Sequence, residues 1–151
     1  MNTTDSKYVL ELSQEDYQKA TIEVAFLLDA FASTIDNIMG GNTAPVGRIA
    51  GRDTARKLPI NLTDPTLDDI IAALREQMQA GFDFSLDGEA LKFKSCIIRE
   101  MCGVRNIETG GALCHLFHSY FDGIVNGLFC RPVKSTIVSV GTECQLQTAV
   151  Q

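Results

Sequence analysis

The spacing of the hydrophobic residues changes near residue 82, and this change limits the fold class. Before that point, apolar side chains recur every three or four residues, which is typical of helices packed on one face. From residue 82 to residue 93 they alternate with polar residues around an Asp87-Gly88 pair, which indicates two strands joined by a tight turn. Helical spacing then returns, and strand-like segments close the chain. This order excludes an all-helical and an all-β protein.

Three helices are predicted before the first pair of strands. The first begins after Ser13, which can cap it, and ends at the glycine pair 40–41. The second covers residues 45–58. The third begins at Asp64-Pro65, with the aspartate as cap and the proline in the first turn, and ends at Gly81.

The remaining chain is expected to form a helix between two hairpins. The second strand should extend over residues 95–98, and a loop should follow over residues 99–110. A helix is predicted for residues 111–129, and strands for residues 133–140 and 144–150. Sequential strand pairs with helices around them indicate an α+β fold, in which helices pack on an antiparallel sheet. One domain should span all 151 residues.

The first helix carries apolar side chains on two faces. The main stripe, which we expect to face the core, contains Tyr17, Ala20, Val24, Leu27, Leu28, Phe31, Ile35 and Ile38. Ile22 and Phe26 lie on the opposite side, where the same core cannot easily cover them. Because exposed apolar patches usually mark interfaces, these two residues predict a homodimer.

The helix expected over residues 111–129 also separates its residues onto two faces. Its apolar side carries Leu113, Phe117, Tyr120, Phe121, Ile124 and Leu128. Its polar side carries His115, His118, Ser119, Asp122 and Asn126. The spacing of His115, His118 and Asp122 suits a metal ion, but an amphipathic helix normally turns such residues to solvent. We therefore expect a solvated surface.

Composition and motifs narrow the classes of function. A net charge of −6 disfavours nucleic-acid binding, which depends on Lys and Arg. No run approaches the roughly 18 apolar residues of a membrane span. The polar N-terminus does not resemble a signal peptide, so we expect a cytoplasmic protein with reduced thiols. The sequence has no nucleophile elbow, Walker loop or dinucleotide motif, and we expect no catalytic activity.

The five cysteines allow two interpretations. They are Cys96, Cys102, Cys114, Cys130 and Cys144, and no two of them form a Cys-x-x-Cys motif. In one interpretation they are small apolar residues of the core. In the other, Cys102, Cys114 and Cys144 converge to bind zinc or iron, or to act as a redox switch.

Several short motifs are similar to those of a known family. They are Cys102, the Gly111-Ala112-Leu113-Cys114 helix entry, Gly123, the Gly141 turn before Cys144, and the Gly47–Arg52 segment. Over about two-thirds of the chain, they resemble the 4-vinyl reductase domain family, also called hydrocarbon-binding domains. The resemblance implies the fold of TRAPP tethering subunits and haem-based nitric-oxide sensors, an apolar ligand between helices and sheet, and a dimer. Cys114 and Cys144 match two zinc ligands of aromatic-sensing members, whereas Lys134 and Ile137 replace the other two.

A ligand pocket is expected between the last helix, the first helix and the sheet. Its predicted residues are Leu28, Phe31, Arg48, Arg52, Phe117, Tyr120 and Phe121. The two arginines could clamp a carboxylate, or they could form surface ion pairs while Gly47 and Gly51 allow close helix packing. The aromatic residues could equally be plain core.

The sequence therefore predicts a domain that binds or senses a small apolar molecule. An assembly subunit without a ligand is the alternative, and a cysteine-based metal or redox sensor is a third hypothesis.

Overall fold

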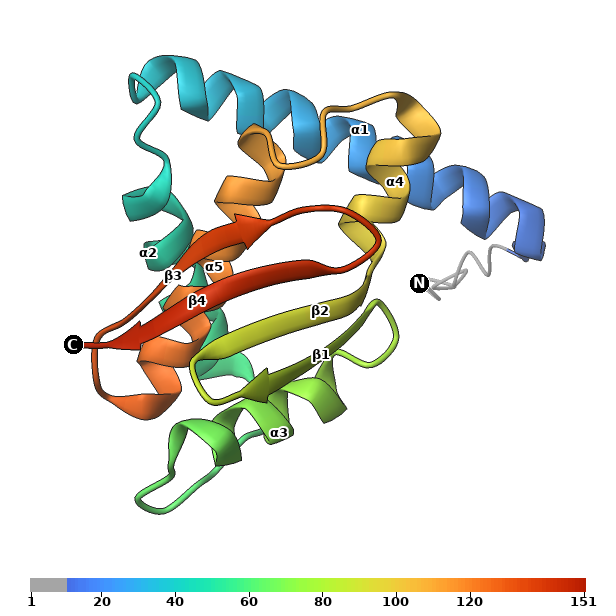
Figure 1. Cartoon of the computed structure of the whole chain (residues 1–151). Coiled ribbons are helices and arrows are strands. Elements are labelled where there is room, and N and C mark those ends of the chain that lie inside the picture. The colour runs from blue at the N-terminus through green and yellow to red at the C-terminus, as the bar shows by residue number, and fades with distance from the viewer. Residues whose placement is uncertain (1–10) are drawn as a thin grey trace, which may run out of the picture.

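The structure is a computed structural model that describes residues 11–151, and it has the expected α+β architecture (Figure 1). The elements are α1 (Gln14–Ile38), α2 (Ala44–Lys57), α3 (Leu67–Gln77), β1 (Phe82–Asp87), β2 (Ala90–Cys96), α4 (Ile97–Arg105), α5 (Ala112–Phe129), β3 (Val133–Ser139) and β4 (Cys144–Val150). The prediction of helices packed on an antiparallel sheet, with two hairpins separated by a helix, is confirmed.

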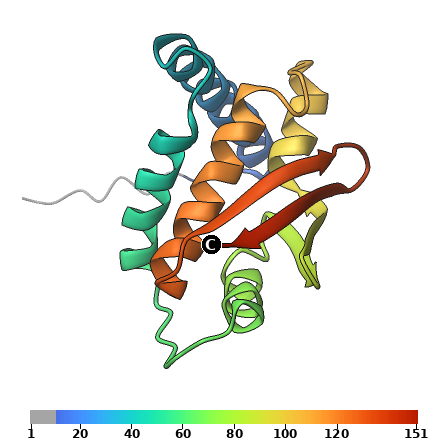
Figure 2. The same ribbon diagram turned by 60° about the vertical axis from the view of Figure 1, so that its left-hand side comes forward.

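The two hairpins join into one four-stranded antiparallel sheet in the order β1-β2-β4-β3. The central strands β2 and β4 place Leu91 opposite Leu146 and Phe93 opposite Cys144. All four of these side chains are buried, because alternate residues of a strand point to the same face of a sheet. Figure 2 shows α5 between the sheet and α2, so the molecule has three layers at this point. α3 lies beside β1 at the edge of the sheet (Figure 1).

The loop expected over residues 99–110 is in fact mostly helical. β2 ends at Cys96, and α4 follows it directly. Cys102 is buried, and it packs with Ala32 of α1 and Leu113 of α5. A nine-residue helix has only two turns of periodicity, and a glycine at position 103 weakens its helix propensity. These features concealed it in the sequence.

The caps were predicted in part. Ser13 forms a reciprocal capping box with Asp16 at the start of α1, as the sequence indicates. The cap of α3 is Thr66, however, and not Asp64. Thr66 has an aspartate three residues later, Asp69, with which it exchanges two hydrogen bonds. Asp64 instead takes a left-handed conformation, with φ 49°, in the preceding turn.

Candidate functional site

α1 packs on the rest of the molecule through its small residues. Ala25 and Ala32 are its buried residues, and Ala32 contacts Cys102 and Leu113. Small side chains let helices approach closely, which explains why this face turns inward. The prediction that the main apolar stripe faces the core is therefore wrong.

The interface predicted at Ile22 and Phe26 lies on the side of α1 that meets α4. Ile22 is half-buried, and Phe26 is 50% exposed. Arg105 of α4 places its guanidinium over the Phe26 ring, 5.0 Å from the ring centroid, and also pairs with Glu23. Contacts within the chain thus account for part of this apolar surface.

The main stripe of α1 faces outward, and we call it the outer α1 face. It consists of Tyr17, Ala20, Val24, Leu27, Leu28, Phe31, Ile35 and Ile38. Tyr17 and Phe31 are each 60% exposed, and Ile38 is 77% exposed. Val24, Leu27 and Leu28 are also exposed, whereas Ile35 is half-buried. In Figure 1, α1 runs along one side of the molecule with α4 and α5 beneath it.

The aromatic residues predicted to line a pocket belong to the packed core between α5 and the sheet. The ring of Phe117 stacks on that of Phe82 at 4.9 Å between centroids. Phe121 meets Phe84 edge to face at 5.2 Å. Tyr120 is half-buried, and its hydroxyl donates a hydrogen bond of 3.1 Å to the Thr54 hydroxyl of α2. These rings fill the space between the layers.

The glycines beside Arg48 and Arg52 allow α2 to lie directly against α5. A Cβ atom on Gly51 would stand 2.0 Å from the carbonyl oxygen of Tyr120, and one on Gly123 would stand 2.3 Å from that of Arg48. The interpretation that the α2 glycines serve close packing is confirmed. Arg48 itself is half-buried, and Arg52 is exposed.

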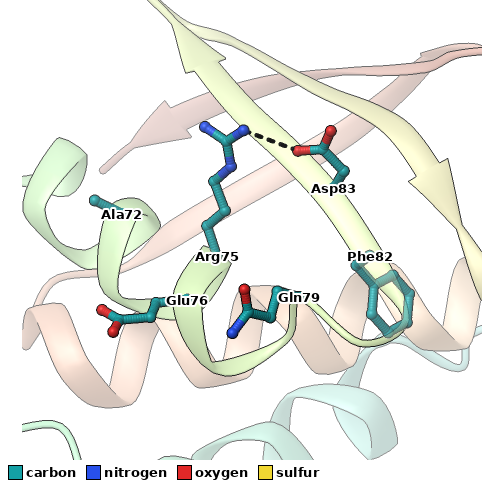
Figure 3. A pocket seen from close by; sticks show the side chains of 6 residues that line it. All are labelled: Ala72, Arg75, Glu76, Gln79, Phe82 and Asp83. Atoms are coloured by element: carbon teal, nitrogen blue, oxygen red, sulfur yellow. Dashed lines mark ion pairs between the residues drawn. The ribbon is translucent and has the colours of Figure 1, made fainter.

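The predicted ligand-binding residues do not meet around one cavity. Leu28 and Phe31 lie on the outer α1 face, Phe117 and Phe121 lie in the core, and the arginines lie on α2. Five surface cavities within residues 11–151, of about 230 Å³ to about 530 Å³, have none of the seven predicted residues in their walls. Figure 3 shows the one of about 480 Å³ between α3 and β1, where Arg75 and Asp83 form an ion pair of 3.1 Å. Its charged rim does not suit an apolar molecule.

Four of the five cysteines are buried where β2, β4, α4 and α5 meet, and Cys130 is exposed. Burial raises the pKa of the Cys102 thiol to about 11, and it also raises the pKa values of Cys96 and Cys114. Across residues 11–151, no three Cys, His, Asp or Glu side chains are grouped to hold a metal ion. The structure thus offers no support for the zinc or iron site predicted at Cys102, Cys114 and Cys144.

The polar side of α5 is partly buried, contrary to the sequence prediction. Asp122 is buried and accepts hydrogen bonds from the backbone N–H and the hydroxyl of Ser135, at 2.9 Å and 2.6 Å. Asn126 accepts one from the N–H of Val133. β3 is an edge strand, and its outward N–H groups need acceptors, which α5 supplies.

His118 was also expected at the solvated surface, but it lies among aromatic rings. Its ring is 5.6 Å from that of Phe93 and 5.4 Å from that of Phe117, centroid to centroid. Its Nδ1 atom has no hydrogen-bond partner. Burial, with a smaller contribution from nearby His115, lowers the pKa of His118 to about 4. The sequence spacing places His118 on the polar face of α5. Its burial depends on the position of the sheet, which the helix pattern does not show.

No protein-family model matches the chain, and no curated protein or solved structure matches it either. No helix in residues 11–151 combines the length and the apolar character that a membrane crossing requires.

Proposed function

We propose that this protein is an assembly domain, and that the outer α1 face is its docking surface. The observation that carries the proposal is that α1 buries alanines and presents its largest apolar side chains to solvent. Burying one such side chain is worth about 1.5–3 kcal/mol, so a partner that covers this face gains considerable free energy. Contiguous apolar surfaces of this kind mark interaction sites.

The charges on α1 favour a protein partner over a lipid surface. The helix carries five acidic residues and one basic residue: Glu15, Asp16, Lys19, Glu23, Asp29 and Asp36. Helices that lie on membranes are rich in Lys and Arg on their polar face, because many lipid headgroups are anionic. An acidic amphipathic helix instead suits an apolar protein surface.

The binding of a small apolar molecule has less support. The rings expected to surround it, Phe117 and Phe121, pack against Phe82 and Phe84. A ligand-binding site normally retains a cavity between its apolar walls. The assembly hypothesis needs no such cavity.

The proposal is tested in extracts of the source cells that express a tagged full chain. On native size-exclusion chromatography, the wild-type chain should elute well above the 16.5 kDa of one copy. The Phe31→Glu chain should elute at the size of one copy, because a charge within the docking surface would have to be buried without a partner. If both chains elute at the size of one copy, the assembly proposal is wrong.

A further inference from the structure

We infer that the partner of the outer α1 face is a second copy of this chain, which packs along α1 in the antiparallel direction. This inference rests on the proposed function and specifies its partner. Most soluble oligomers are two-fold symmetric dimers, whose interface must be complementary to itself. A homodimer through α1 therefore requires an outer α1 face that is complementary to itself.

The outer α1 face is symmetric about the point between Leu27 and Leu28. In an antiparallel pair of helices centred there, residues whose numbers add to 55 lie at the same height. The pairs are Tyr17 with Ile38, Ala20 with Ile35, Val24 with Phe31, and Leu27 with Leu28. All eight members of the outer α1 face are thus used, and each meets another apolar residue.

Side-chain size favours the antiparallel direction over the parallel one. The antiparallel pairs combine Ala20 with Ile35 and Val24 with Phe31, so a smaller side chain meets a larger one. In a parallel pair, Phe31 would meet Phe31 and Ala20 would meet Ala20, which would leave layers of unequal width. A parallel arrangement would also bring the acidic first turns, Glu15 and Asp16, beside their own copies.

The area of the outer α1 face is adequate for a dimer. α1 is about 37 Å long at 1.5 Å per residue, so it forms a continuous stripe rather than scattered contacts. The six exposed large side chains are 48% to 77% exposed, and two of them, Tyr17 and Phe31, are aromatic residues of about 150–250 Å² each, so together they offer roughly 600 Å² per chain. Two copies would bury about 1,200 Å², which is the lower end of the range for specific interfaces.

The first experiment measures the mass of the purified full chain by sedimentation equilibrium at micromolar concentration. We expect about 33 kDa, twice the mass of one copy, for the wild type. The Phe31→Glu variant should have the mass of one copy and an unchanged circular dichroism spectrum, because Phe31 is exposed and outside the core. The matched control is Ile49→Glu, which places the same charge on an equally exposed residue of α2, 61% exposed, and should leave the dimer intact.

The second experiment tests the direction of the helices by oxidative cross-linking in a Cys130→Ser background, which lacks the exposed native thiol. Leu27→Cys alone should cross-link two copies, since it lies at the centre of symmetry. Tyr17→Cys alone should not, because its two copies would be about 32 Å apart in the antiparallel pair. The double variant Tyr17→Cys, Ile38→Cys should cross-link. Efficient cross-linking of Tyr17→Cys alone would overturn the antiparallel direction.

The outcomes separate this inference from the proposed function. A purified chain of about 16.5 kDa would overturn the second-copy inference. If the same chain still elutes as a larger species in the cell extract, and Phe31→Glu abolishes that species, the assembly proposal stands with a different protein as partner.

Discussion

Glycines of this chain differ sharply in what surrounds them, and two substitutions expose the difference. A Cβ atom on Gly51 would overlap the Tyr120 carbonyl oxygen at 2.0 Å, and backbone atoms cannot give way without separating the helices. We expect Gly51→Ala to lower the free energy of unfolding by about 3 kcal/mol or more. The measurement is urea denaturation followed by circular dichroism.

Gly103 provides the matched control within α4. A Cβ atom there meets nothing within 4 Å, and alanine has the higher helix propensity. Gly103→Ala should therefore raise the free energy of unfolding by about 0.5–1 kcal/mol. Similar losses for both variants would contradict the close contact between α2 and α5.

His118 should make stability depend on pH between its folded and unfolded pKa values. Its folded pKa of about 4 lies below the ordinary value of 6.5, so between these values the unfolded chain binds a proton that the folded chain does not. Stability is then fully present above pH 6.5 and is lost as the pH falls toward 4. From pH 7.5 to pH 5 we expect a loss of about 2 kcal/mol.

Two variants isolate this contribution. His118→Phe keeps an aromatic ring between Phe93 and Phe117 but cannot titrate, so the loss between pH 7.5 and pH 5 should disappear. The control is His115→Gln, which changes an exposed histidine and should preserve the loss of stability between pH 7.5 and pH 5. Burial raises the pKa of Asp122, so its protonation as the pH falls favours the folded state and acts in the opposite direction. A pH dependence that survives in His118→Phe would refute this assignment.

At the scale of elements, the buried carboxylate of Asp122 makes two of the hydrogen bonds that attach β3 to α5. Asp122→Ala would leave the N–H and the hydroxyl of Ser135 without their acceptor. We expect a loss of about 2–3 kcal/mol, because hydrogen bonds to a charged group are stronger than neutral ones. Hydrogen exchange at the Ser135 amide should accelerate more than exchange at the centre of β2. Asp53→Ala, which removes an exposed ion pair with Arg56, serves as control and should change stability little.

The elements with a long or strict hydrophobic pattern could be predicted from the sequence. β1 and β2 alternate clearly around Gly88, and the 18 residues of α5 give five turns of helical periodicity. α4 could not be predicted, because its nine residues bury chiefly Cys102. Short helices depend on tertiary contacts more than on their own pattern.

The direction in which an element faces was harder to predict than its existence. On α1 the larger stripe was assigned to the core, although Ala25 and Ala32 are the residues that turn inward. Hydrophobicity alone cannot separate a core face from a docking face when a helix has apolar residues on both sides. On α5, His118 and Asp122 follow a polar spacing, yet the sheet covers them. Asp122 meets Ser135 of β3 and His118 lies beside Phe93 of β2, so both contacts come from strands whose positions the spacing within α5 does not reveal.

At the scale of the whole molecule, the predicted ligand pocket combines residues of α1 with residues of α5. In the structure the α1 residues lie on the surface and the α5 residues lie in the core, so they do not form one site. In the sequence, Phe31 and Phe117 both belong to apolar stripes of helices that are expected to pack together, which predicts one shared pocket. α1 does contact α5, but with its alanine side. Within residues 11–151, the structure thus separates the packed core around Phe117 from the exposed surface around Phe31.

The contact between α2 and α5 also has a consequence for biosynthesis. The residues that meet, such as Gly51 and Gly123, are separated by much of the chain, and within residues 11–151 α2 has no other partner of comparable extent. At about 5–20 residues per second, a ribosome needs roughly 4–14 s to translate from the end of α2 to the end of α5. During that interval the nascent chain carries α1 and α2 without the helix on which both rest, so the alanine side of α1 and the glycine side of α2 stay uncovered until α5 has been made.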